Sequence, residues 1–422
     1  MSVSITNNKQ SKLYNKNFSI LIVGQIISLF GSAIQRFALS LYLLDLTGSA
    51  SIFATILALS VIPIIILSPF AGVMADRFNK RNIMVALDTL SGIIIVIYGV
   101  ILFTGNDHYI IVAVMMLLLS GISTLYQPSV TASIPVIVGD EHLMKANGMV
   151  YQVSSLSNFL GPIIAGILYG FLGIKGVIVI NGISFFVSAA MELFLTIPFE
   201  KVESKQSPIQ MFRAEISEAV QYLKNENRIL FRMIFTSGLY NLFLVPVFSV
   251  GAPYIIKIML GMSSQMYGLA EGVIAFGMII GAFIISQKPN LCHINRIYFV
   301  LYPSCLSMFI MGAALFLPDT ASGRLWSFVL FTFFGMGIML SLGIANVISA
   351  TYIQQAAPAT MLGKISAFGA AFATLCVPLG QVVFGGLLEL LKEHVAILVI
   401  LSAICTFGVT LIVSWNVRQV QD

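Results

Sequence analysis

The chain has 422 residues, of which 58% are hydrophobic and only 9% carry a charge. A soluble globular domain has about 25% charged residues, and so few charges could not cover the surface of a water-soluble chain of this size. The net charge of +5 does not indicate nucleic-acid binding, because the basic residues stand in short segments between apolar runs and form no basic patch. We therefore expect a protein whose main solvent is lipid.

A helix needs about 20 mostly apolar residues to cross a bilayer. Twelve such runs follow one another along the chain. They cover residues 18–44, 50–75, 82–104, 109–137, 144–171, 175–198, 229–257, 264–286, 294–317, 325–351, 361–389 and 395–414. The expected fold class is an all-α integral membrane protein with twelve transmembrane helices in two six-helix bundles.

A polar stretch near the middle of the chain divides the twelve runs into six and six. We expect an N-terminal bundle over 1–198, a cytoplasmic central loop over 199–228 and a C-terminal bundle over 229–422. In the loop, Ile216 and Leu223 recur at helical spacing among charges, which predicts an amphipathic helix on the inner membrane surface. A simple tether between the halves is the alternative. The segments LGPIIAGIL and LGQVVFGGLL occupy matching places in the two halves, which favours an internal repeat.

The distribution of basic residues predicts the orientation. If the N-terminus is cytoplasmic, 17 of the 22 Lys and Arg residues fall on the inner side, and one, Arg36, falls within a span. The outer ends hold only Lys175, Lys257, Arg324 and Lys392. This excess places both termini in the cytoplasm.

The loop after the second run carries the most specific motif, GVMADRFNKR. It resembles the signature loop of the major facilitator superfamily, in which a glycine precedes Asp-Arg and a basic pair. The matching residues are Gly72, Asp76, Arg77, Lys80 and Arg81. A second glycine is common where this chain has Asn79. The resemblance implies a conformational latch, in which Asp76 accepts hydrogen bonds from a helix N-terminus and the basic residues pair with acids such as Asp88.

A second resemblance lies in the fifth run. Gly161, Pro162 and Gly166 match the glycine-proline motif of the superfamily's antiporters, where proline bends the helix and glycines permit close packing. Ala165 departs from the usual glycine by one methyl group. Together with Ala146–Gly148, the stretch is similar to the macrolide-efflux and siderophore-exporter branch of drug:proton antiporters, which implies proton-driven export of small amphipathic compounds.

Polar residues inside a span are costly and often functional. The first run carries such residues at steps of three or four, on one helix face that we expect to line a central cavity. Arg36 stands out, because a guanidinium within the bilayer needs a carboxylate, carbonyls or water. The candidates for the cavity wall are Gln25, Ser32, Gln35, Arg36, Gln127, Asn241 and Asn346.

Four acids fall inside or near the spans. A low-dielectric environment favours the neutral form of a carboxyl, which suits a group that carries a proton. Glu271 is the first candidate for proton coupling and Asp88 the second, although Glu271 could instead form a fixed ion pair or lie solvated at the outer rim. We expect Asp45 to be solvated at the outer end of its helix and Glu192 to be structural.

The sequence favours a transporter over an enzyme. The histidines lack metal-ligand spacing, the cysteines form no CxxC pair, and no phosphate-binding or nucleophile motif occurs. We expect no cofactor and no metal, with a proton gradient as energy source, a lipid bilayer and a small amphipathic substrate as partners, and a monomer. The alternatives are a lysolipid or nutrient facilitator or importer on the same fold, and a non-transporting receptor or scaffold.

Overall fold

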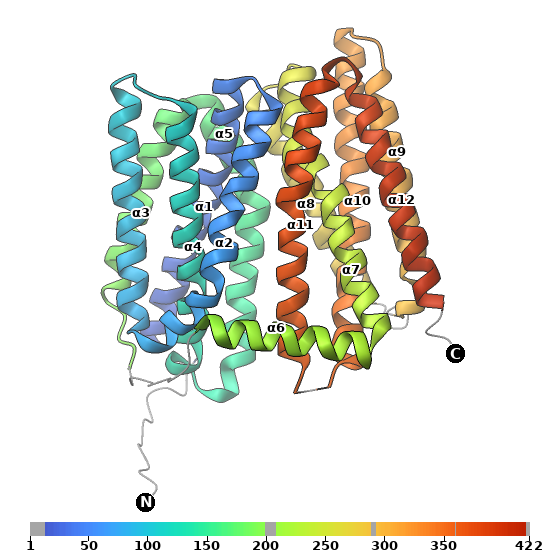
Figure 1. The fold of residues 1–422 in the computed structure, drawn as a ribbon. Coiled ribbons are helices and arrows are strands. Elements are labelled where there is room, and N and C mark those ends of the chain that lie inside the picture. Colours follow the sequence, from blue (N-terminus) through green and yellow to red (C-terminus); the bar gives the residue numbers. More distant parts are fainter. Residues whose placement is uncertain (1–12, 199–207, 288–292, 359, 419–422) are drawn as a thin grey trace, which may run out of the picture. The chain divides into compact units, whose positions relative to one another are not determined.

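The computed structural model describes residues 13–198, 208–287, 293–358 and 360–418 (Figure 1). These ranges are helical and contain no β-strand. The predicted all-α fold class is confirmed. The N-terminal residues 1–12 and the first part of the predicted central loop, 199–207, lie outside the described residues.

The long helices follow the predicted runs closely. Of the helices in the described ranges, 11 are long and apolar enough to cross a membrane. The helices are α1 (Lys16–Thr47), α2 (Ala50–Arg77), α3 (Lys80–Phe103), α4 (Tyr109–Ile137), α5 (Leu143–Glu192), α6 (Pro208–Asn225), α7 (Arg228–Phe243), the π-helical segments η2 (Val247–Gly251) and η3 (Tyr254–Met259), α8 (Ser264–Gln287), α9 (Ile297–Ala313), α10 (Ala321–Ala356), α11 (Leu362–Leu390) and α12 (Val395–Arg418).

Helix α5 contains two spans. Its 50 residues are interrupted at Gly173, whose φ of 63° is non-helical and suits a residue without a side chain. Hydrogen bonds place both ends of α5 beside the start of α1. The amide of Asn15 donates to the carbonyl of Ile137, just before α5, and the amide of Asn17 donates to the carbonyl of Thr196, just after it, each over 2.9 Å. The chain therefore reverses at Gly173, between the predicted fifth and sixth runs, and the described residues contain all twelve predicted spans.

The structure divides into two compact units. One comprises residues 1–39 with 62–209, and the other comprises residues 40–61 with 210–422. The turn between α1 and α2 thus belongs, by its contacts, to the second unit. The sequence analysis instead placed the domain boundaries at the two ends of the central loop, 199–228, and these boundaries stay a prediction.

Two polar contacts hold the α1–α2 turn within the second unit. Lys257 donates to both carboxylate oxygens of Asp45 over 2.5 and 2.7 Å. Glu389, near the end of α11, accepts hydrogen bonds from the Ser49 hydroxyl at 3.1 Å and the Ala50 backbone amide at 3.0 Å. Its negative charge therefore lies at the N-terminus of α2, where a helix favours an anion. Asp45 is exposed near the end of α1, as expected, and it also pairs with Lys257, which is more than 200 residues distant in the chain and cannot be predicted from local sequence.

The segment between the spans contains a helix, α6, that crosses the ends of α7 and α11 (Figure 1). Its buried residues Ala219 and Leu223 pack against Leu230 of α7 and Ile365 of α11. An ion pair between Glu218 and Lys364, with 2.6 Å between oxygen and nitrogen, lies at the edge of this contact. The apolar face of α6 is therefore covered by the second unit's own helices.

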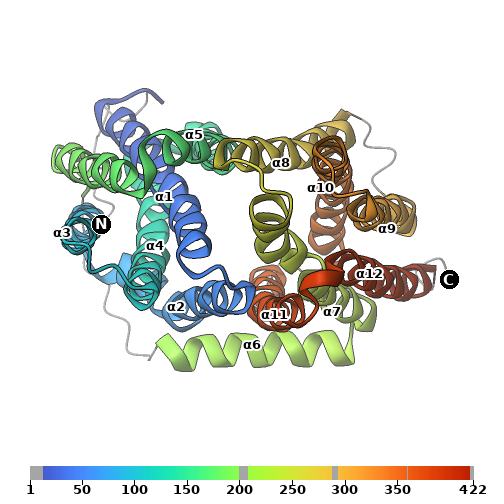
Figure 2. The same cartoon turned by 90° about the horizontal axis from the view of Figure 1, so that it is seen from above.

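Helices α8 and α10 pack with their backbones in close contact (Figure 2). A Cβ atom on Gly277 would lie 2.2 Å from the carbonyl oxygen of Met336, and one on Gly281 would lie 2.1 Å from that of Leu340. Because lipid is as apolar as the side chains, such close approach through small residues is a main source of helix association in membranes.

We predict that Gly281→Ala lowers the free energy of unfolding by about 1–3 kcal/mol, because the added methyl group must push two backbones apart. Thermal unfolding of the purified protein in detergent measures the effect. Gly386→Ala is the matched control, since a Cβ there would meet no atom within 4 Å. Equal melting temperatures for the two variants would contradict the backbone contact.

Candidate functional site

A buried polar cluster lies in the first unit where α1, α3, α4 and the second half of α5 meet. The amide nitrogen of Gln25 donates to the Tyr126 hydroxyl over 2.8 Å, and that hydroxyl donates to Glu192 over 2.5 Å. The Ser28 hydroxyl donates to Asp88 over 3.2 Å. Asp88 and Glu192 are only 2% and 1% exposed. We call these five residues the acid cluster.

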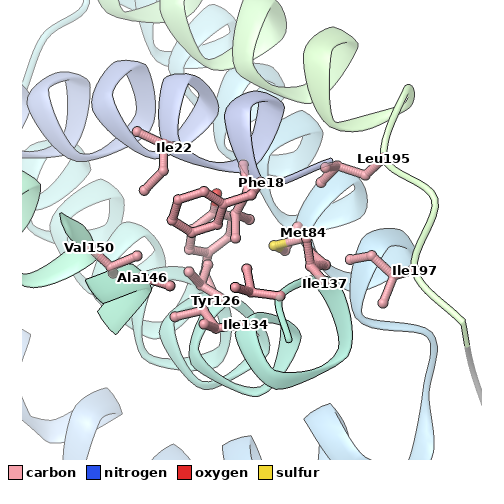
Figure 3. Close-up of a cluster of buried hydrophobic side chains, with 13 residues drawn as sticks. Phe18, Ile22, Met84, Tyr126, Ile134, Ile137, Ala146, Val150, Leu195 and Ile197 are labelled. Carbon is pink, nitrogen blue, oxygen red and sulfur yellow. The ribbon is translucent and has the colours of Figure 1, made fainter. Parts of the chain in front are cut away.

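Apolar side chains close the acid cluster toward the end of the unit where α1 begins. Figure 3 shows Tyr126 surrounded by Phe18, Ile22, Met84 and Ile134, all buried. The Tyr126 ring belongs to this apolar group while its hydroxyl reaches the acid cluster. Asp88 lies about 12 Å along α3 from its first residue, whereas Glu192 is the last residue of α5 and is buried at that helix end.

Two residues predicted for the cavity wall are instead buried between helices. Gln25 is 0% exposed within the acid cluster, and Gln35 is 2% exposed, with its oxygen accepting a 2.6 Å hydrogen bond from the Asn181 amide. In this structure both side chains face neighbouring helices of the first unit and not a cavity wall. Two other polar residues of α1 that were predicted for the cavity wall are less buried: Ser32 is half-buried and Arg36 is exposed.

The other predicted cavity residues show different environments in their own units. Gln127 of α4 is half-buried. In the second unit, the amide of Asn241 donates to the carbonyl of Ala373 over 3.2 Å, whereas Asn346 is exposed.

Glu271, the first candidate for proton coupling, is half-buried in α8. Its carboxylate accepts a 2.9 Å hydrogen bond from the Tyr267 hydroxyl one turn earlier. No ion pair joins Glu271 to a basic side chain among the described residues, so the fixed-ion-pair alternative has no support here.

The loop motif between α2 and α3 has a local structural role for Asn79. Its side-chain oxygen accepts a 3.1 Å hydrogen bond from the backbone amide of Arg81 and so caps α3. This explains how the turn forms without the second glycine of the family pattern. Lys80 begins α3, and Arg77 ends α2.

Gly72 and Asp76 of the loop motif lie open in the part of the chain that the structure describes. A Cβ on Gly72 would meet no described atom within 4 Å. Asp76 is exposed, and the described residues provide it with no hydrogen bond from a helix N-terminus. The proposed pairing of Arg81 with Asp88 is also wrong, because seven residues separate them by about 10 Å along α3 and Asp88 binds Ser28 of α1.

The glycine-proline motif packs α5 against α1. A Cβ on Gly161 would lie 2.6 Å from the Cβ of Ala33, closer than two side chains can approach. Pro162 lies within α5, and Gly166 is buried. The motif thus produces the close helix contact expected of it. That the motif indicates an antiporter stays a prediction.

Sequence reasoning missed Tyr126 altogether and assigned Glu192 no part in the site. One available signal was that Asp88 and Glu192 stand in the predicted third and sixth runs, each about two turns from the predicted cytoplasmic end of its run. The pairing itself depends on how the helices pack, which no local pattern shows.

Comparison with known proteins decides the family. The sequence profile of the Major Facilitator Superfamily matches residues 21–381. The chain belongs to this superfamily. It is therefore a multi-pass membrane transporter, which agrees with the resemblance seen in the loop motif.

Several relatives of this chain carry the names of exporters. Macrolide efflux protein A of Streptococcus pyogenes is 24% identical over 379 residues, which cover 89% of each chain. A putative bacilysin exporter, BacE, of Bacillus amyloliquefaciens is 21% identical over 88% of each chain. The crystal structure of the nucleoside transporter NupG has the same fold, with a TM-score of 0.72, 12% identity and coverage of 95% of this chain and 99% of that one.

We predict that Asp76→Asn and Arg77→Ala insert normally but transport at least about fivefold more slowly, as expected when a charge that biases two conformations is lost. Both substitutions leave the apolar spans intact. Flux through purified, reconstituted variants is the measurement, with Lys145→Ala as a control that removes an exposed charge near the same end of the first unit. Wild-type flux in both motif variants would exclude a conformational role for the loop.

We predict that Arg36 lines a water-filled cavity. A lipid-facing arginine at its depth would cost at least about 2.5 kcal/mol, so its exposed side chain is better placed in water. Arg36→Lys should weaken transport, because an ammonium cannot reproduce the paired hydrogen bonds of a guanidinium. In an Arg36→Cys variant without the native cysteines, the thiol should react with a water-soluble reagent, and erythromycin should slow the reaction. An unreactive thiol with normal transport by Arg36→Lys would place Arg36 at the lipid interface.

Proposed function

We propose that this transporter exports small amphipathic compounds, such as a drug, a macrolide or a siderophore-like molecule, in exchange for protons. The observation that supports proton coupling is Glu271, a carboxyl within a membrane-spanning helix whose bonded partner is the hydroxyl of Tyr267. A carboxylate without a basic partner is poorly stabilised away from water, so taking up a proton is the favourable response. Glu271 can thus change charge as its access to water changes.

Export is supported by the relatives. The macrolide efflux protein and the putative bacilysin exporter match most of this chain. Their identity of 21–24% supports export as the type of activity more strongly than it supports any one substrate. The class of cargo in the proposal rests on these names and on the glycine-proline motif of α5. The excess of basic residues in one set of loops supports a plasma-membrane protein with both termini in the cytoplasm.

The test is transport in proteoliposomes with erythromycin as probe and an imposed proton gradient. The wild-type protein should accumulate erythromycin against its concentration gradient and should stop when the proton gradient is removed. Glu271→Gln keeps the shape and hydrogen bonding of the side chain but cannot titrate, so gradient-driven accumulation should fall about tenfold or more. Exchange of internal for external erythromycin should survive in the variant.

Glu393→Gln is the matched control, because it removes an exposed acid outside the helical bundles. If Glu271→Gln accumulates as much erythromycin as the control under the proton gradient, Glu271 has no part in proton coupling. Wild-type liposomes that show no gradient-dependent erythromycin flux would contradict this proposal for macrolides. Uptake of a growth substrate by whole cells would then favour the facilitator alternative.

A further inference from the structure

The acid cluster of the first unit has more hydrogen-bond acceptors than donors. The second oxygens of Asp88 and Glu192 and the side-chain oxygen of Gln25 are buried and accept no hydrogen bond from any described residue. The hydroxyls of Ser28 and Tyr126 already donate to the first carboxylate oxygens, and the Ser188 hydroxyl, which lies beside Asp88, donates to the backbone carbonyl of Gly24 over 3.3 Å. A buried acceptor without a donor costs about 1–3 kcal/mol, so the cluster is stabilised by any group that brings a donor.

The charges in the cluster are also uncompensated. Asp88 and Glu192 are connected to the same face of α1, because Asp88 bonds Ser28 and Glu192 is linked through Tyr126 to Gln25, three residues earlier. The titratable groups that face one another are Asp88 from α3, Tyr126 from α4 and Glu192 from α5, while α1 contributes the neutral side chains of Gln25 and Ser28. No basic side chain forms an ion pair with either acid among the described residues. Two like charges in an apolar site cannot both be maintained, and one proton relieves the repulsion.

We propose that Asp88 and Glu192, with Tyr126 between α4 and α5, form a binding site for one exchangeable proton that the two carboxyls share. A proton taken from water converts one carboxylate into a neutral carboxyl, whose O–H then donates to an acceptor that has no other donor. Release returns the proton to water and restores the carboxylate. The ligand of this site is thus a proton, and the two acids act as a pair.

The second unit provides an internal comparison. Its first, third and sixth spans, α7, α9 and α12, are the counterparts of α1, α3 and the second half of α5. There the Tyr240 hydroxyl bonds the Thr410 hydroxyl, and the Cys305 thiol lies 3.2 Å from the same oxygen of Thr410. The corresponding spans of the second unit thus also meet in a buried polar contact, but that contact is made of neutral groups. Neutral groups are therefore sufficient to join such spans, and the proton site gives the acids of the first unit a role beyond packing.

The apolar group around Tyr126 limits access to this site. Phe18, Ile22 and Met84 cover the cluster toward the end where α1 begins (Figure 3). Proton exchange with water on that side requires these side chains to separate, so movement of α1 and loading of the site are linked. If the proposed proton-driven export is correct, this pair is a second coupling site besides Glu271. The claim that the pair holds a proton does not depend on transport.

Infrared difference spectroscopy of the purified protein between acidic and alkaline pH tests the site, because the carbonyl stretch of a protonated carboxyl is distinct from that of a carboxylate or an amide. In the first protonation step below alkaline pH, we expect the double variant Asp88→Asn with Glu192→Gln to lose the intensity of about one carboxyl, since the second proton of a coupled pair binds only at lower pH. Each single variant should shift the apparent midpoint of the titration, since the remaining acid loses its charged neighbour. Thr410→Val is the matched control and should leave the carboxyl band unchanged.

The outcomes separate the possibilities. An unchanged band in the folded double variant would overturn the site, and so would the loss of two independent carboxyls. Should the acid variants fail to fold, Tyr126→Phe decides, because it keeps the ring within the apolar group but removes the hydroxyl that donates to Glu192. A shift of the carboxyl band in Tyr126→Phe supports the site, and an unshifted band overturns it. A protein with this band but without erythromycin flux would retain the proton site and lose only the proposed function.

Discussion

A polar side chain within a membrane-spanning helix has no water to bond, so a neighbouring helix must satisfy it. Apolar contacts do not specify which helices pair, because lipid offers an equally apolar surface. The specific contacts in this transporter are therefore hydrogen bonds between helices and close approaches at glycine. Gln35 of α1 bonds Asn181 of α5, Asn241 of α7 bonds the backbone of α11, and Gly281 brings α8 against α10.

These contacts also determine what can move. Separating α1 from its neighbours would break the hydrogen bonds of Gln25 with Tyr126, of Ser28 with Asp88 and of Gln35 with Asn181, at about 1–3 kcal/mol for each buried group left without a partner. The same argument applies to Tyr240 and Thr410 in the second unit. Each unit is consequently better suited to moving as a body than helix by helix, which is what alternating access through two bundles requires.

The sequence predicted the fold well because its signal is length and apolarity, which the bilayer imposes directly on each helix. Even the reversal at Gly173 falls between two predicted runs. The site was predicted less well. The spacing of polar residues along α1 shows that they share one helix face, but it does not show what that face contacts. Gln25 and Gln35 share that face with Arg36, but they face helices of their own unit. Asp88 was assigned to a basic residue nearby in sequence, whereas its partner, Ser28, lies on another helix 60 residues away.

The capping of α2 has a consequence for how the α1–α2 turn can part from α11. The Ser49 hydroxyl donates to Glu389 and also accepts a 3.3 Å hydrogen bond from the backbone amide of Ile52, in the manner of an ordinary N-cap. Removal of Glu389 would thus take one acceptor from the first turn of α2 and leave another in place. The first turn of α2 would thus stay helical. The α1–α2 turn could then separate from α11 and bind it again without refolding, so each rebinding would cost little conformational entropy.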